Sequence, residues 1–248
     1  MKRKSPVKST PEPNTAKPTE DLCFYNKIPR QYLDEVLPNP NFDDHQFIIP
    51  FRACVVAPSG SGKTSWIGNL ISKFSKGAGT FVSIIIVVKN KDEAIYRYLA
   101  SLSDAIQIKE GGVEQIPPLD KVDKDVANLL IVDDLQNEKN LQSVCDWYIR
   151  CRKRNCSICF LSQNYYVTPI VIRRNCNYLV ILKLSGNREI KTILHEAGVG
   201  ITIDQLMNMY EYSTRDKFNA FIIDYENNDI NHRYRHNFNE YLCPDDFA

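Results

Sequence analysis

The sequence predicts an α/β fold of three layers, in which a mostly parallel central sheet lies between two layers of helices. Two observations predict it. Strand-like runs of Val, Ile and Leu alternate along the chain with stretches of helical periodicity, and several of these runs are apolar at every position. Continuous apolar runs are typical of strands buried on both faces, and strands separated by helices favour a parallel sheet joined by right-handed crossovers.

The predicted strands span residues 52–57, 81–88, 129–133, 157–162, 178–184 and 220–225. The predicted helices span residues 63–74, 92–102, 141–150, 188–197 and 203–210. A short amphipathic segment at 31–37 precedes the first strand, and the chain contains no internal repeat. We therefore expect residues 23–248 to form a single domain.

The composition excludes several classes of protein. The 248 residues carry 31 Lys and Arg against 30 Asp and Glu, and this balance excludes a polycation that coats nucleic acid by bulk charge. The longest apolar run, Ile84–Val88, is too short to cross a bilayer. Residues 1–22 are rich in Lys, Pro, Ser and Thr and almost free of apolar side chains, so we expect a disordered tail.

The eight cysteines are expected to be reduced thiols, because no signal peptide opens the chain and secretion is not expected. Cys156 and Cys159 have the C-x-x-C spacing of a metal site. Both lie on a predicted strand, where positions three apart point to opposite faces of the sheet. The two sulfurs are therefore not expected to share a zinc ion.

The segment 57–64, Ala-Pro-Ser-Gly-Ser-Gly-Lys-Thr, follows a predicted strand and opens a predicted helix, as a phosphate-binding loop does. Gly60 and Gly62 allow the backbone to wrap around a phosphate, and the helix directs its positive end at the same anion. Lys63 suits the β- and γ-phosphates, and the Thr64 hydroxyl suits Mg²⁺. The loop departs from the usual pattern only in having Ala57 in place of the first glycine. The expected nucleotide-binding residues are Ser59, Gly60, Ser61, Gly62, Lys63, Thr64 and Ser65.

Two further strands end in residues suited to nucleotide hydrolysis. The strand at 129–133 ends in Asp133, which fits a metal carboxylate, and Asp134 follows as the candidate general base. The strand at 157–162 is followed by Gln163, an amide that can bond both the γ-phosphate and the attacking water. With the phosphate loop, these residues predict a P-loop NTPase of the three-layer RecA/ASCE type that uses ATP and Mg²⁺.

The order of the strands also bears on the class of enzyme. Nucleotide kinases and GTPases usually place the metal carboxylate beside the phosphate-loop strand, whereas ring-forming motor ATPases insert another strand between them. The run at 81–88 lies between these two strands in the sequence. The guanine motif Asn-Lys-x-Asp is absent, because 90–92 reads Asn-Lys-Asp.

Arginines cluster before and after the strand at 157–162. The segment 150–154 holds four cations in five residues, and Arg173 with Arg174 precedes the next strand. Cations at the end of a helix stabilise its negative dipole end, which accounts for 150–154 without any function. An arginine finger for a neighbouring subunit accounts for the same residues, and both interpretations stay open.

Taken together, residues 52–184 resemble the FtsK–HerA branch of ring ATPases, and specifically the DNA-packaging ATPases of poxviruses, giant viruses and virophages. The resemblance implies that Lys63 and Thr64 hold nucleotide and Mg²⁺ and that Asp133 completes the metal site. It implies that Asp134 activates water, where many relatives have Glu, and that Gln163 senses the γ-phosphate. Arg152 and Arg173 match the family's two arginines, one before and one after the sensor strand.

The function implied is a ring motor that packages double-stranded DNA into a capsid, working with itself and with portal, capsid or internal-membrane proteins. It would act in the viral factory of the host cytoplasm or in the virion. Candidate DNA contacts are residues 109–112 and 232–236. The alternatives are a P-loop nucleotide kinase acting on a small acceptor and an ATP-gated assembly or scaffold protein with little turnover.

Overall fold

A computed structural model describes residues 23–33, 36–197 and 200–248 of the chain. The chain divides into two units, Met1–Val36 and Leu37–Ala248. The described part of the first unit contains two short 3-10 helices, Phe24–Lys27 and Arg30–Tyr32. The predicted disordered tail at 1–22 lies outside the described residues, as do two positions of the expected amphipathic segment at 31–37.

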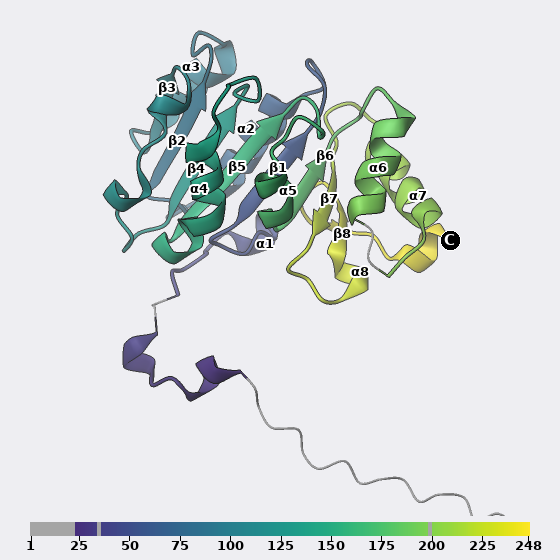
Figure 1. The fold of residues 1–248 in the computed structure, drawn as a ribbon, viewed down its shortest axis with the longest axis horizontal. Helices are drawn as coiled ribbons and strands as arrows, with labels where there is room; N and C mark the ends of the chain where they lie inside the picture. Colours follow the sequence, from purple (N-terminus) through teal and green to yellow (C-terminus); the bar gives the residue numbers. More distant parts are fainter. Residues whose placement is uncertain (1–22, 34–35, 198–199) are drawn as a thin grey trace, which may run out of the picture. The chain divides into compact units, whose positions relative to one another are not determined.

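The second unit is built on a sheet that, over the described residues, has nine strands. They are β1 Arg52–Val56, β2 Ser83–Val88, β3 Ile106–Glu110, β4 Asn128–Asp133, β5 Cys156–Ser162, β6 Tyr178–Ile181, β7 Phe221–Asp224, β8 Tyr234–His236 and β9 Glu240–Tyr241. Their order across the sheet is β3-β2-β4-β5-β1-β6-β7-β8-β9, as Figure 1 shows for the labelled strands. The six strands from β3 to β6 are parallel, and β7, β8 and β9 extend the sheet in antiparallel fashion.

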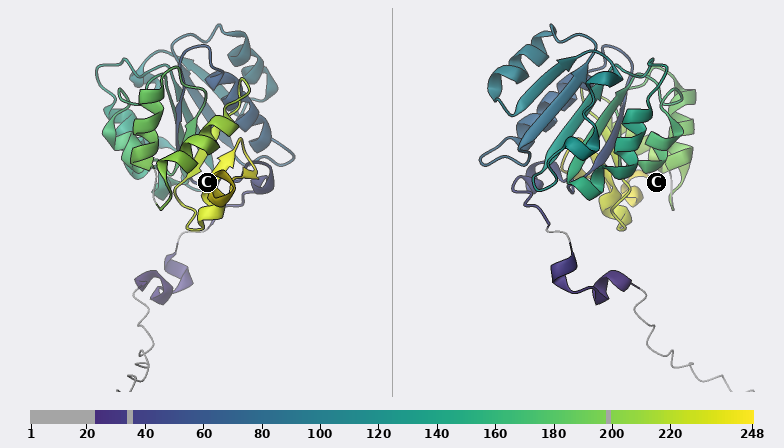
Figure 2. Two further views of the ribbon diagram at one scale, coloured as in Figure 1. Left: turned by 90° about the vertical axis from the view of Figure 1, so that its right-hand side faces the viewer. Right: turned by 60° about the vertical axis from the view of Figure 1, so that its left-hand side comes forward.

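The helices of this unit are α1 Phe42–His45, α2 Lys63–Phe74, α3 Ala94–Leu102, α4 Gln142–Arg150, α5 Ile170–Asn175, α6 Asn187–Ala197, α7 Ile203–Ser213 and α8 Ile230–Arg233. Short 3-10 helices span Val113–Gln115, Leu119–Lys121, Cys151–Arg154 and Pro244–Phe247. Two separate apolar clusters cover the two faces of the sheet: α2 and α3 contribute to one, and α4, α5, α6 and α7 to the other. Figure 2 shows the sheet between these helices, so the predicted three-layer α/β fold is confirmed.

Strand β5 shows why the central strands have continuous apolar sequences: both of its faces are buried. All seven residues of β5 are buried, and neighbours alternate between the two apolar clusters. Cys156 belongs to the cluster under α4 and Cys159 to the cluster under α2. The expectation that the two cysteines point to opposite faces is therefore confirmed.

Each predicted strand and helix is present, with ends shifted by three residues at most. The elements that sequence analysis missed lie mainly at the edges of the sheet. Strand β3 is an edge strand with the sequence Ile-Gln-Ile-Lys-Glu, of which only Ile106 is buried, so it lacks the apolar run of the central strands. Strands β8 and β9 have three and two residues, too few to show a period.

The strand at 81–88 does not separate the phosphate-loop strand from the Asp133 strand. In the sheet β2 lies on the far side of β4, and the strand between β1 and β4 is β5. The two strands are separated as in ring-forming motors, but by the strand that precedes Gln163. The order of the strands in the sequence did not predict their order in the sheet, because the chain places β2 and β3 at the outer edge before β4 returns to the centre.

Within the segment 232–236, the expected DNA contact is wrong for Arg235, which is completely buried, whereas His232 is exposed. The Arg235 Nη1 atom donates to the carbonyls of Gln46 at 3.0 Å and Phe238 at 2.8 Å. Its Nη2 atom lies 3.6 Å from the Asp224 carboxylate. Arg235, on the short strand β8, thus lies in the core, where it joins β8 to the chain around α1.

We expect Arg235→Ala to destabilise the protein by about 3–5 kcal/mol, because the change leaves Asp224 buried without its cation. The measurement is the free energy of unfolding in denaturant. Arg174→Ala, at an exposed arginine, is the control and should change it by less than about 0.5 kcal/mol. A similar small loss for both variants would contradict a role for Arg235 in the core.

Candidate functional site

The carboxyl ends of β1, β5 and β4 meet at one edge of the sheet. Val56 at the end of β1 pairs with Ser162 of β5, and Asp133 at the end of β4 pairs with Leu161. Neighbouring strands lie about 4.8 Å apart, so the start of the phosphate loop and Asp133 are separated by only about 10 Å across the sheet. The loop, Asp133, Asp134 and Gln163 are therefore brought to one place.

The phosphate loop bends between β1 and α2 through two glycines with left-handed backbone angles. Gly60 has a φ of 74° and Gly62 a φ of 101°, which other residues rarely adopt. Within the bend, the Ser61 N–H donates to the Pro58 carbonyl at 3.3 Å. Helix α2 then begins at Lys63, so its first N–H groups face the bend without intrahelical partners. This is the local geometry that binds an anion.

The Lys63 ammonium lies inside the bend. Its Nζ donates to the carbonyls of Ala57 at 2.6 Å and Pro58 at 3.1 Å, and the residue is only 8% exposed. Burial lowers the pKa of Lys63, and the charges of Asp133 and Asp134 oppose that shift. The side chain therefore stands between the loop and the two carboxylates, where a phosphate oxygen would meet it.

Asp133 is held by a tyrosine that sequence analysis missed. The Tyr96 hydroxyl of α3 donates to Asp133 Oδ2, and the Thr64 side chain hydrogen-bonds the same phenol oxygen. Tyr96 is 2% exposed. Burial raises the pKa of Asp133, while the Tyr96 hydrogen bond lowers it. One phenol thus joins the two residues expected to hold Mg²⁺. The available signal was the position of Tyr96 three residues before Leu99 on the buried face of its helix.

The donor set at Thr64 and Asp133 fits Mg²⁺. This ion prefers oxygen ligands and usually keeps several waters, so that one or two protein groups together with phosphate oxygens suffice. One hydroxyl and one carboxylate beside the phosphate loop meet that need. In the described part of the chain no group of three or more His, Cys, Asp or Glu could hold a metal by itself. Thr64 and Asp133 are therefore the residues that would hold a Mg²⁺ ion brought with phosphate.

Asp134 and Gln163 are joined directly. The Gln163 Nε2 atom donates to Asp134 Oδ1 at 2.8 Å. Asp134 has a φ of 58°, a conformation that Asp tolerates, and this turn leaves its side chain exposed while Asp133 is buried. Gln136, which sequence analysis did not single out, accepts from the Gln163 N–H at 2.9 Å and donates to Asp134 Oδ1 at 3.3 Å. Gln136 therefore fixes the positions of Asp134 and Gln163 relative to each other.

Arg152 lies at the opposite edge of the sheet. It belongs to the 3-10 helix that precedes β5, whereas Gln163 follows β5. A seven-residue strand rises about 3.3 Å per residue, so about 20 Å separates Arg152 from the site of its own chain. Arg154 is bound to the carbonyls of Asp120 at 3.1 Å and Val122 at 2.8 Å. Of these two arginines, Arg152 is the exposed one.

Arg173 forms contacts within its own chain. Its Nη1 atom lies 2.8 Å from Glu196 Oε2, and its guanidinium lies 4.8 Å from the centre of the Tyr165 ring. Its Nε atom donates to the Thr168 carbonyl at 3.2 Å. These contacts tie α5 to α6 and to the segment after Gln163, and none of those recorded for the described residues is with the phosphate loop.

Comparisons with known proteins show a family and a shared fold. Residues 41–233 match the model of the family described as Poxvirus A32 protein. The genome packaging NTPase B204 from Sulfolobus turreted icosahedral virus 2 in complex with ATP-gammaS is 12% identical, with a TM-score of 0.52 over 77% of this chain and 98% of that chain. The same protein in complex with sulfate is 12% identical, with a TM-score of 0.50 over 71% of this chain and 92% of that chain.

At such identities the structural likeness shows the fold, which is that of the P-loop NTPases. No curated protein sequence gives a match. The family model covers more than three quarters of the chain and includes the phosphate loop, Asp133, Asp134 and Gln163. The chain belongs to the Poxvirus A32 protein family.

Proposed function

We propose that this chain is a Mg²⁺-dependent ATPase that works as a ring of identical subunits and drives double-stranded DNA into a viral capsid. The observation that carries the proposal is the sheet order β4-β5-β1, with Asp133, Gln163 and the phosphate loop at one edge. A strand inserted between β1 and β4 is the arrangement of ring-forming motors and not that of nucleotide kinases. Family membership and the fold shared with a genome packaging NTPase support the biological role.

In the proposed reaction the protein positions the γ-phosphate and a water. The N–H groups of the loop, the α2 terminus and Lys63 hold the triphosphate. Thr64 and Asp133 would hold Mg²⁺, which when bound neutralises charge on the β- and γ-phosphates. Asp134 accepts the proton of the attacking water, and Gln163, bonded to Asp134, orients that water and contacts the γ-phosphate.

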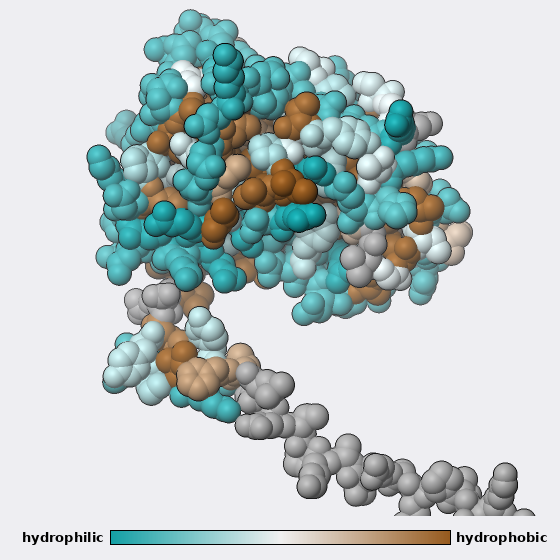
Figure 3. Space-filling view, viewed as in Figure 1, coloured by the Kyte–Doolittle hydropathy of each residue, from teal (hydrophilic) through white to brown (hydrophobic). Residues whose placement is uncertain are grey.

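An arginine acting in this site would come from a neighbouring subunit. Arg152 lies about 20 Å from its own site, by the strand rise of β5, and is exposed, so in this reaction it could act only on the site of another copy. The surface over α4 and α5 is partly apolar: Ile149 of α4, near Arg152 in the sequence, is 56% exposed, and Ile170 of α5 is 50% exposed. Figure 3 shows apolar side chains on the face where Figure 1 places α4 and α5. We assign this face to the contact between subunits.

DNA would be contacted through a few cationic loops of each subunit, because a net charge of +1 excludes binding by bulk positive charge. Of the two segments expected from sequence, 109–112 stays a candidate. It comprises the last two residues of β3 and the two glycines after them, at the carboxyl end of the strand, where the phosphate loop also lies. No helix in the described residues is long and apolar enough to cross a membrane. Portal, capsid or internal-membrane proteins remain the proposed docking partners, in the viral factory or the virion.

The decisive experiment is ATP hydrolysis measured with and without double-stranded DNA, with the oligomeric state determined in the same buffer. We expect DNA to stimulate turnover.

Asp134→Asn should keep ATP binding and lower turnover by roughly 100- to 10,000-fold, because it removes the general base. Lys63→Ala should abolish ATP binding. Stimulation by a nucleoside monophosphate in place of DNA would indicate a kinase, and ATP binding without turnover a scaffold.

A mixing experiment tests Arg152. Ring subunits carrying Arg152→Ala keep their own phosphate loop, and Lys63→Ala subunits keep their arginine. If the arginine acts across a subunit contact, mixing two inactive proteins should restore part of the hydrolysis. Arg154→Ala mixed in the same way is the comparison, because Arg154 is bound to carbonyls of its own chain. Absence of rescue with Arg152→Ala would argue against action in trans.

A change at Tyr96 tests the metal site. Tyr96→Phe removes the hydrogen bond to Asp133, so we expect the Mg²⁺ concentration for half-maximal hydrolysis to rise roughly tenfold, as for other groups that orient a metal ligand. ATP binding measured without metal should stay unchanged. Tyr98→Phe, on the exposed side of α3, is the matched control. An unchanged Mg²⁺ dependence would show that Tyr96 has only a packing role.

A further inference from the structure

An aromatic side chain far along the sequence touches the phosphate loop. A Cβ added to Gly62 would lie 2.2 Å from Phe218 Cδ1, so the edge of the Phe218 ring rests directly on this glycine. Phe218 belongs to the segment 214–220 between α7 and β7. Because β7 is antiparallel to β6 and Phe221 pairs with Ile181, this segment enters the sheet at the edge that holds the phosphate loop.

The backbone at Phe218 is strained, and hydrogen bonds from the turn after β8 hold the segment around it. Its φ of 74° is an unusual conformation for a bulky residue, and such strain gathers at functional sites. The turn after β8 fixes the segment through Asn237, whose Oδ1 accepts from the Ala220 N–H at 3.0 Å. The Asn237 Nδ2 atom also donates to Asn219 Oδ1 at 3.1 Å. The ring is therefore presented on a fixed support.

One face of the Phe218 ring is available to a planar ligand. The side chain is 47% exposed. Gly62 touches only the ring edge, and the Lys217 ammonium lies over one face, 4.9 Å from the ring centre. Aromatic rings in such settings bind nucleic-acid bases by stacking, with about 1–3 kcal/mol for each base. A base stacked here would lie next to the loop that holds the phosphates.

A cavity of about 400 Å³ begins at Phe218 and runs along α2. Its lining includes Trp66, Asn69 and Asn219. The Trp66 Nε1 atom is buried and, among the described residues, has no hydrogen-bond partner. A buried donor without a partner is costly, and the ring nitrogens of a purine are acceptors that would satisfy it. The side-chain amides of Asn69 and Asn219 add both hydrogen-bond donors and hydrogen-bond acceptors to the lining.

We propose that the purine base of ATP stacks on Phe218 at the mouth of this cavity, and that Phe218 is the residue by which the site prefers a nucleotide to a bare triphosphate. The inference rests on the proposed ATP-binding function and adds to it the binding site of the base. The phosphate loop supplies attraction for phosphates only, so recognition of the base needs a second group beside it.

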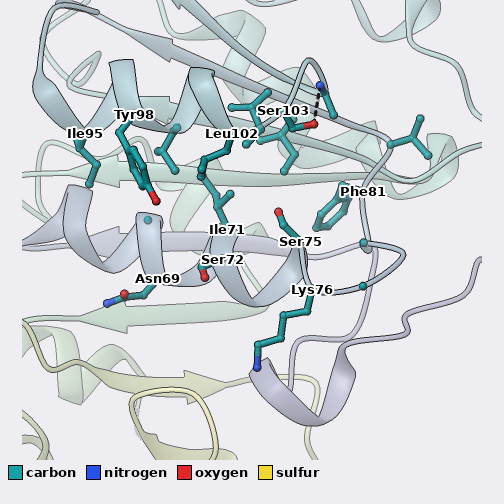
Figure 4. Close-up of a pocket in the computed structure, with 18 of the residues that line it drawn as sticks. Asn69, Ile71, Ser72, Ser75, Lys76, Phe81, Ile95, Tyr98, Leu102 and Ser103 are labelled. Atoms are coloured by element: carbon teal, nitrogen blue, oxygen red, sulfur yellow. Dashed lines mark hydrogen bonds between the residues drawn. The ribbon is translucent and has the colours of Figure 1, made fainter.

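A second cavity, of about 1030 Å³, lies along the adjacent face of α2, shares Asn69 and Ser72 with the first, and is the alternative place for the base. Figure 4 shows Ile95, Tyr98 and Leu102 of α3 pointing toward α2 across this groove, with Leu102 next to Ile71. Tyr98 is exposed and offers an aromatic ring. The groove runs along the whole of α2 and is lined mainly by aliphatic groups and serines. Phe218, in contrast, touches the glycine that precedes Lys63, so it is the aromatic ring better placed for a base whose phosphates lie in the loop.

The test compares the binding of ATP and of inorganic tripolyphosphate, each with Mg²⁺, by calorimetry. Phe218→Ala should weaken ATP binding roughly 5- to 100-fold, as expected for the loss of one stacked base, and leave tripolyphosphate binding unchanged. Phe218→Leu keeps an apolar group against Gly62 but lacks the flat face, so it should show the same loss. Phe218→Trp should keep ATP affinity, and Tyr98→Ala should change neither ligand.

Each other outcome overturns the inference in a recognisable way. Equal weakening of both ligands in Phe218→Leu would mean that the ring only supports the phosphate loop. Loss of ATP affinity in Tyr98→Ala, with Phe218→Ala unaffected, would place the base in the groove between α2 and α3. If the wild-type protein bound neither ATP nor tripolyphosphate, the proposed ATP-binding function would fail together with the inference. The melting temperature of each variant confirms that it is folded.

Discussion

The parallel register of β1, β5 and β4 is the constraint on which the rest of the structure depends. It sets Val56 beside Ser162 and Leu161 beside Asp133, so three separate segments of chain end at one edge of the sheet. The strands are buried on both faces, and a slip of one residue would turn every side chain to the wrong cluster. Apolar packing thus fixes the position of polar groups that contribute nothing to that packing.

The electrostatics of the site follow from the same burial. Lys63 and Asp133 are both largely removed from water, and burial alone would favour the neutral form of each. Their mutual attraction and the Tyr96 hydrogen bond oppose that tendency. Asp134 is exposed because the left-handed turn after β4 takes it out of the sheet. Two successive carboxylates therefore have different surroundings and can have different tasks.

Sequence analysis predicted the parts of the site that depend on local pattern. The phosphate loop has its own motif, and Asp133 and Gln163 could be placed because strand tips of a parallel sheet share an edge. Tyr96, Gln136 and Phe218 could not be found this way, because their importance arises from contacts across 37, 27 and 156 residues of chain with Asp133, Gln163 and Gly62. Arg235 was misjudged for the same reason, since its partners come from both ends of the second unit.

Strand β5 has a mechanical consequence of its own. It is a short rod, buried along its full length, with Gln163 just beyond one tip and Arg152 just before the other. Because β5 is paired with β1 on one side and with β4 on the other, it cannot slide along its axis without breaking both sets of hydrogen bonds. The backbone positions of Gln163 and Arg152 therefore keep a fixed separation, and a distortion in the middle of this strand would disturb both ends of the sheet at once.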